Sequence, residues 1–340
     1  MTKNFKRLIF YFVGLSAFIL TSVTLRTVAC ITEFNPSTGY FDGKICITIA
    51  DWLAVFGVCF SLSYIGSQRQ NIKFAASFDN AATYIPAGLV SAALFFVSAE
   101  LFVEATRAIG GFSISAMSRS GNLLTLILSI LALAGVGSFL LRCLVINKES
   151  ALRGGFDIAF IVFSALLTAY LYFDVSAPLN SPAKITDEMA FLLISVFFLY
   201  ETRISLGREM WRPYIAFGMA AALVSAYSSI PAIILYFVKD ITISNSISQS
   251  VLALTISAFI ICRLLLILTL PEDKKCPAVE AILFMQGEKE RIKAENQTNL
   301  ARAKDINEEN SIDEQDNSEN YTFNIEEISN ISSENMREDG

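Results

Sequence analysis

The sequence predicts an all-α, polytopic transmembrane helical bundle of about eight spans with a disordered acidic C-terminal tail. The chain of 340 residues is 54% hydrophobic and only 17% charged, whereas soluble domains are about 25% charged. Eight apolar stretches approach the roughly 20 residues that cross a bilayer as a helix. Acidic residues gather after the last stretch, where residues 271–340 hold 8 Lys and Arg against 18 Asp and Glu.

The eight spans are continuous apolar runs, not the alternating segments of about ten residues that form a membrane barrel. We expect them at 8–28, 47–66, 83–105, 122–146, 156–173, 189–207, 213–237 and 249–270. The fifth stretch is short and is the least secure crossing, and the ends of the sixth are poorly defined.

The chain divides into a transmembrane part, 1–270, and a polar part that begins where Pro271 stops the last helix. Residues 271–304 are expected to form a cytoplasmic or membrane-surface helix, because apolar residues near 280 precede charges of alternating sign. Residues 305–340 are expected to be disordered, because their Asn, Ser and Glu cannot bury enough apolar surface to fold.

Lys and Arg in the loops and at the helix ends predict the orientation, since they concentrate on the cytoplasmic side of a membrane. Counted over alternate loops, one side has 13 of them and the other has 6. The six are Arg26, Lys44, Arg107, Arg119, Lys184 and Lys239. This predicts a multi-pass protein with both termini in the cytoplasm.

The first span has a second interpretation, as a cleaved signal peptide, because Lys3, Lys6 and Arg7 precede an apolar run. The run ends near Cys30 in a segment that resembles a lipoprotein cleavage site only loosely. Arg26 also interrupts the apolar run, which favours an uncleaved first helix.

Several classes of active site have no support in the sequence. The chain has no histidine, which removes the commonest general base and the commonest metal ligand. Its six cysteines form no C-x-x-C pair, and phosphate-binding glycine loops and selectivity-filter sequences are absent. The basic loops are short and close to the bilayer, unlike a nucleic-acid surface. We therefore expect no catalytic residue, no metal, no cofactor and no nucleic-acid partner, and the protein is expected not to be an enzyme.

A candidate solute path is suggested by acids at the outer helix ends and by the seventh span. Glu100 and Glu104 share one helix face, and Asp51 begins a span on the same side. The seventh span has small residues at four-residue spacing, followed by Tyr227, Ser229 and Pro231. The alternative is that these acids are solvated in the headgroup region and that the seventh span is a tightly packed helix with a proline kink.

Two further pairs of residues are candidates for contact, because the members of each pair lie at a similar depth on the same side of the membrane. Arg263 lies about seven residues, or roughly 10 Å, before the inner end of the last span, where it either pairs with Glu201 or snorkels to the surface. Cys30 and Cys46 flank the first outer loop, as a disulfide that closes the loop or as two free thiols.

Three segments resemble those of uncharacterised multi-span membrane proteins of anaerobic Gram-positive bacteria. They are the turn Asn35-Pro36-Ser37-Thr38-Gly39, Tyr200-Glu201-Thr202-Arg203, and Tyr227-Ser228-Ser229-Ile230-Pro231. The resemblance covers roughly 8–270 and implies a bacterial cytoplasmic membrane, but it brings no activity and no functional residue.

Two functions remain open at this point. The first is a non-enzymatic membrane anchor or sensor whose acidic tail binds a cytoplasmic protein. The second is a transporter or channel for a small solute, and the outer acids suggest that this solute is a cation. The sequence does not indicate the oligomeric state.

Overall fold

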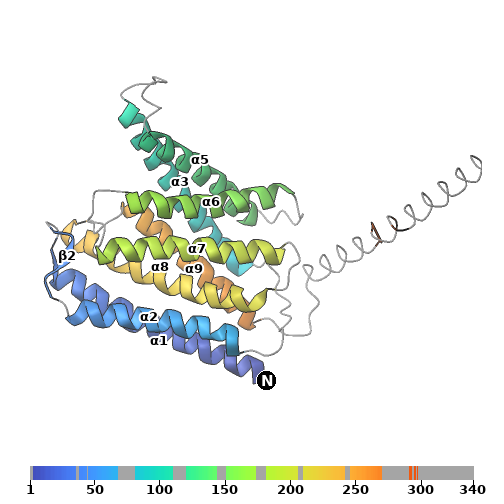
Figure 1. Ribbon diagram of the computed structural model, residues 1–340, viewed down its shortest axis with the longest axis horizontal. Helices are drawn as coiled ribbons and strands as arrows, with labels where there is room; N and C mark the ends of the chain where they lie inside the picture. The colour runs from blue at the N-terminus through green and yellow to red at the C-terminus, as the bar shows by residue number, and fades with distance from the viewer. Residues whose placement is uncertain are drawn as a thin grey trace, which may run out of the picture. The chain divides into compact units, whose positions relative to one another are not determined.

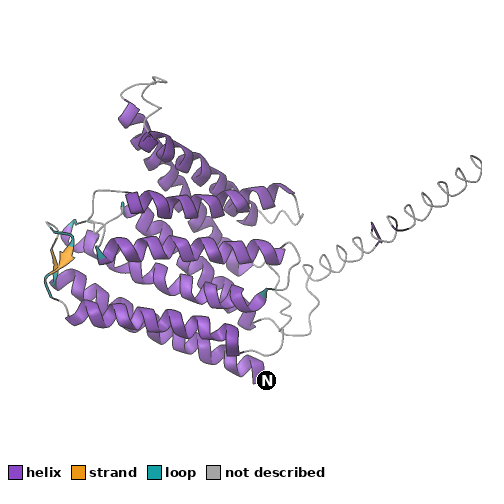
Figure 2. Ribbon diagram, in the orientation of Figure 1, coloured by secondary structure: helices purple, strands orange, loops and turns teal. Residues whose placement is uncertain are grey.

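The computed structural model describes residues 3–35, 38–43, 45–67, 81–109, 120–143, 151–173, 181–205, 210–241 and 246–269, and four positions near 294. Within them the chain is almost wholly helical, with one short antiparallel hairpin (Figure 2). The helices are α1 (Lys3–Thr32), α2 (Ile45–Ser67), α3 (Ala81–Ile109), α5 (Ser120–Cys143), α6 (Ala151–Phe173), α7 (Pro182–Ser205), α8 (Trp211–Lys239) and α9 (Ile247–Thr269).

The eight helices match the eight predicted spans one for one, and the chain is an all-α transmembrane bundle. Seven of these described helices are long and apolar enough to cross a membrane, and they include α6, the fifth predicted span. The helix outside this set is α7, the sixth span. Its apolar centre is flanked by Lys184, Asp187 and Glu188 at one end and by Glu201 and Arg203 at the other.

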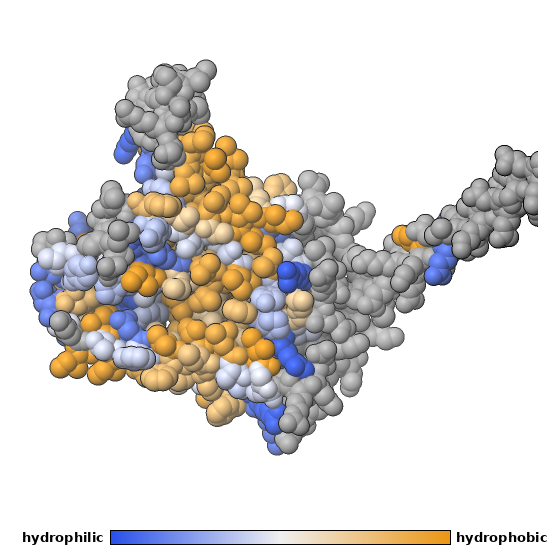
Figure 3. Space-filling view, viewed as in Figure 1, coloured by the Kyte–Doolittle hydropathy of each residue, from blue (hydrophilic) through white to orange (hydrophobic). Residues whose placement is uncertain are grey.

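Successive helices run in alternating directions, which places the start of α1 and the end of α9 at one end of the bundle (Figure 1). We call this the N-end. The opposite end has the hairpin of β1 (Phe34–Asn35) and β2 (Tyr40–Phe41), and we call it the hairpin end. The side view in Figure 3 has a broad hydrophobic band between the two ends, as expected for a surface in contact with lipid.

Helix α8 lies at the centre, where it packs against α1, α2, α7 and α9. Its small residues allow this: a Cβ added at Gly218 would lie 2.9 Å from the ring of Phe197 on α7. Ala222 and Ala226, which continue the four-residue spacing, are also buried. The small-residue rows of the seventh span therefore form a tight interface between helices.

The other helices complete the bundle around α8. Helix α3 packs against α5 and α9, and α6 packs between α5 and α7. In Figure 1 the α3–α5 pair is inclined to the remaining helices.

The hairpin lies at the predicted turn between the first two spans, of which Pro36 and Ser37 are outside the described residues. Phe34 pairs with Phe41 and Asn35 with Tyr40, and Gly39 takes a positive φ of 72° that glycine adopts without steric cost. Cys30 and Cys46 are free thiols in the structure, so no disulfide closes this loop.

The chain has a second compact unit, 281–340, which we describe by itself. Its described positions are Arg291, Ile292, Glu295 and Gln297, all helical and exposed. They lie in the stretch where a helix was expected, whereas the expected disordered tail, 305–340, lies outside the described residues.

We predict that α7 enters a membrane poorly as a single helix, because an acid costs up to about 3 kcal/mol at a helix centre and somewhat less nearer its ends. The segment Pro182–Ser205, tested alone in a host protein that reports insertion, should cross less often than α9 tested in the same way. Asp187→Asn and Glu201→Gln together should restore crossing. Equal insertion of the unaltered α7 and α9 segments would contradict this.

Candidate functional site

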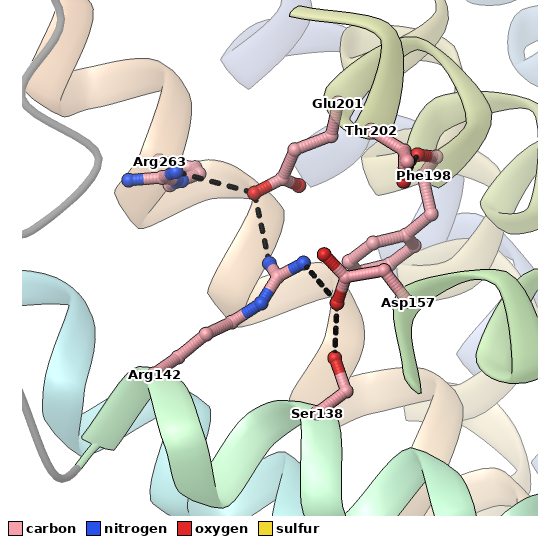
Figure 4. A network of polar contacts seen from close by, with 7 residues as sticks. All are labelled: Ser138, Arg142, Asp157, Phe198, Glu201, Thr202 and Arg263. Atoms are coloured by element: carbon pink, nitrogen blue, oxygen red, sulfur yellow. Dashed lines mark hydrogen bonds and ion pairs between the residues drawn. The ribbon is translucent and has the colours of Figure 1, made fainter. Parts of the chain in front are cut away.

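A cluster of buried charges lies at the N-end and joins four helices. Arg142 on α5 donates from Nη1 to Glu201 Oε1 on α7 over 2.8 Å and from Nη2 to Asp157 Oδ1 on α6 over 3.0 Å. Arg263 on α9 donates to the same Glu201 oxygen over 3.2 Å. Ser138 donates to Asp157. Figure 4 shows Arg142 between the two carboxylates, with Arg263 on the far side of Glu201.

This N-end cluster, defined as Ser138, Arg142, Asp157, Glu201 and Arg263, is electrically balanced. Its two cations face two anions, and all four charged residues are at most 8% exposed. Removing a charge from water costs several kcal/mol, and a pair repays this only with good geometry and further hydrogen bonds. The cluster therefore holds its helices in one specific arrangement, because each charge depends on the others.

Aromatic rings surround the central guanidinium. Arg142 Cζ lies 5.2 Å from the ring centroid of Phe139, 5.6 Å from that of Phe198 and 5.7 Å from that of Phe259. Rings at these distances attract a cation through their quadrupoles and exclude water. The ion pairs thus lie in an apolar enclosure, where electrostatic interactions are stronger than at a surface.

A second polar cluster lies towards the hairpin end. Arg26 on α1 donates to Thr186 Oγ1 on α7 over 2.7 Å, and its Cζ lies 4.3 Å from the ring centroid of Tyr227 on α8. The Tyr227 hydroxyl donates to Asp51 Oδ1 on α2 over 2.5 Å. Ser228 on α8 donates to Asp187 on α7. We call Arg26, Asp51, Thr186, Asp187, Tyr227 and Ser228 the hairpin-end cluster.

Arg26 is only 2% exposed, and its Nε and Nη1 make no hydrogen bond of good geometry among the described residues, although the Cys30 thiol and the Tyr227 side chain lie beside the guanidinium. A buried donor without an acceptor costs about 1–3 kcal/mol. The hairpin-end cluster is therefore less well satisfied than a fully bonded network.

The six residues of the candidate solute path fall into separate places. Asp51 and Tyr227 meet in the hairpin-end cluster. Ser229 is fully buried and donates to the Ser225 carbonyl of its own helix over 2.6 Å, and Pro231 is buried within α8. This packing corresponds to the alternative interpretation of the seventh span, a tightly packed helix.

Glu100 and Glu104 lie elsewhere, in an open hollow of about 820 Å³ whose described lining is Ala99, Glu100, Val103, Glu104 and Arg107 of α3. Ser248 on α9 donates to Glu100. The Tyr170 hydroxyl on α6 donates to Glu104, 3.0 Å from Oε1. Neither Asp51 nor Ser229 is in the lining of this hollow.

The structure brings Glu201 and Arg263 together, as their predicted depth and side suggested. Sequence reasoning missed Asp157 and Asp187 and counted Arg26 and Arg142 only as topology signals. The available signal was the position of Arg26 and Asp157 inside apolar spans, where a charged residue needs a partner. Among the described residues, no three His, Cys, Asp or Glu side chains are placed to hold a metal ion.

The helices and clusters describe an integral, multi-pass membrane protein. No protein-family model, curated protein or solved structure matches the chain. The roles of the residues above follow from their own contacts.

We predict that Glu201→Gln destabilises the protein strongly, because it leaves two buried arginines to share one carboxylate. Breaking a buried pair costs on the order of 3 kcal/mol, which corresponds to a fall of roughly 5–10 °C in the unfolding temperature in detergent. The exposed Glu104→Gln is the matched control and should shift it by less than about 2 °C.

The double variant Glu201→Gln/Arg263→Gln restores the charge balance and should recover part of the loss, as expected for coupled residues. Additive effects of the two single variants would show that the pair is not coupled.

Proposed function

We propose that this protein is a non-enzymatic membrane anchor or sensor that binds a soluble protein through its acidic C-terminal segment. The observation that carries the proposal is the attachment of α9, the last transmembrane helix before that segment. Arg263 lies six residues before the end of α9 and pairs with Glu201, which Arg142 joins to α5 and α6. The helix from which the segment continues is thus fixed to three others by buried charges.

The packing of the bundle supports an anchoring role. Ser225 and Ser229, on the central helix α8, are fully buried, and so are Ala220, Ala221 and Ala222. A close-packed centre resists deformation, which suits a scaffold better than a path for solutes.

The C-terminal segment has the charge of a binding segment. Residues 271–340 have a net charge of −10, from 8 basic and 18 acidic residues. Such a segment attracts proteins with a basic surface, and the attraction weakens as salt screens the charges. We infer a partner of that chemistry on the side where both termini lie.

That side is proposed to be the cytoplasm of a bacterial cell. The buried positions of Arg26 and Lys184 support this orientation, because these residues were counted on the opposite side but are enclosed by protein. On the basic side, Arg142 is likewise buried. When these three buried residues are left out of the count, the excess of Lys and Arg on the basic side becomes larger.

We predict that deleting 305–340 abolishes binding of the partner without unfolding the bundle. Proteins cross-linked to the full chain in native membranes should be lost from the deletion variant, while its unfolding temperature stays within about 2 °C of that of the full chain, because the core is intact. A chain with residues 305–340 in shuffled order tests whether charge alone suffices. Retention of the same cross-linked proteins after deletion would contradict the proposal.

A second function, transport of a small cationic solute, is favoured by the hollow along α3. Its two carboxylates lie about ten residues or fewer from the hairpin end of α3, where they can attract cations from solution. A carrier would also require α8 to bend at Pro231, as discontinuous helices do in secondary transporters.

In this case Glu100→Gln should reduce uptake of an organic cation into liposomes by about tenfold or more, the effect of losing one charged contact. Pro231→Ala should also reduce uptake, because it restores a continuous α8. Deletion of 305–340 should leave uptake unchanged. Uptake no faster than in empty liposomes would exclude this candidate for the cations tested.

A further inference from the structure

The hairpin end of the bundle has a small hydrophobic core of its own, separate from the main core. Its buried members are Ala29, Cys30, Phe34, Phe41, Ile47 and Leu235, contributed by the end of α1, the hairpin, the start of α2 and the end of α8. We call these segments the cap. The Phe34 and Phe41 rings meet edge to face with centroids 5.4 Å apart.

The hairpin-end cluster lies where the cap meets the main core. Along α1, Val23 belongs to the main core and Ala29 to the cap, with Arg26 between them. Along α2, Ile47 belongs to the cap and Ala50 to the main core, and Asp51 directly follows Ala50 at the start of the main-core part. The boundary is thus a layer of polar side chains.

Helix α8 crosses this boundary at a break in its own hydrogen bonding. Tyr227 belongs to the main core, Leu235 belongs to the cap, and Pro231 lies midway between them. Proline has no N–H to donate to the carbonyl four residues before it, here that of Tyr227. This position is therefore where α8 bends at least cost.

A few bonds hold the cap closed. Tyr227 donates to Asp51, and Ser181 donates to the Gly39 carbonyl over 3.1 Å. The bond from Lys239 to the Ile31 carbonyl lies within the cap and holds its segments together. The Arg26 guanidinium favours opening, because two of its nitrogens are buried without a hydrogen bond of good geometry among the described residues. Water that entered the layer would satisfy those donors.

We propose that the cap opens as one unit, with α8 bending at Pro231, and that opening admits water from the hairpin end to the hairpin-end cluster. Its small core makes the cap a unit of low local stability, while the main core stays folded. The hydrogen bond from Tyr227 to Asp51 is the latch, because it joins the central helix to the helix that carries part of the cap. Tyr227 is a positioning residue in this device.

Cys30 is a native reporter of opening, because its thiol is fully buried in the cap. The full chain in lipid nanodiscs is labelled with a membrane-impermeant maleimide, and the labelling rate is read by peptide mass spectrometry. Cleavage after Arg26 and Lys44 separates Cys30 from Cys46. Cys262, half-buried on α9, reports any general loosening of the main core.

Tyr227→Phe should raise the Cys30 labelling rate about tenfold, the size expected for one hydrogen bond to a carboxylate, and leave the Cys262 rate unchanged. Pro231→Ala should lower the Cys30 rate, because it restores the helix hydrogen bond. Tyr214→Phe, a buried tyrosine at the other end of α8, is the control and should leave the Cys30 rate unchanged. Equal Cys30 rates in Tyr227→Phe and the unaltered protein, or parallel changes at Cys262, would overturn the proposal.

Hydrogen exchange of the unaltered protein gives a second measurement that needs no variant. The amides of 29–34 and 235–239 should exchange at a common rate, faster than those of 214–226. Protection of 235–239 equal to that of 214–226 would overturn the proposal.

Discussion

The fold depends on the pairing of two buried acids on α7. Asp187 and Glu201 lie near opposite ends of that helix, and each is less than a tenth exposed. An unpaired charge at this depth would be expelled towards water, and α7 would leave the bundle with it. At the N-end, Arg142 and Arg263 pair with Glu201. At the hairpin end, Ser228 donates to Asp187 and Arg26 donates to the adjacent Thr186. The least apolar helix therefore determines how the more apolar ones are arranged.

Hydropathy predicted the spans because bilayer thickness determines the length of a crossing helix, whatever its neighbours. The same argument placed Arg263 and Glu201 at similar depth on the same side, which was enough to suggest their contact. Depth alone, however, does not determine which way a side chain points around its helix. The contacts of Arg26 with Thr186 and of Tyr227 with Asp51 join residues more than 150 positions apart, so only tertiary packing reveals them.

The length of the apolar stretches was a poor guide to which predicted span crosses the membrane least readily. The fifth stretch was expected to be the least secure because it is short, yet α6 extends back to Ala151 and its Asp157 is paired. The sixth stretch has enough length, but its charges exclude α7 from the helices that are apolar enough to cross. How readily a helix crosses the membrane therefore depends on where its charged residues lie and whether they are paired. The length of an apolar stretch does not measure this.

The two ends of the bundle differ in how their polar groups are enclosed. At the N-end, phenylalanine rings of the main core surround a balanced set of ion pairs, so any movement there exposes several charges at once. At the hairpin end, a separate core of six buried side chains covers the layer of polar groups. Helix α7 contributes to both clusters, with Asp187 and Glu201 fourteen residues or about 21 Å apart. Glu201 pairs in turn with Arg263 on α9. Helix α7 is therefore the element that joins the two polar clusters, and through Glu201 it also joins the hairpin-end cluster to α9.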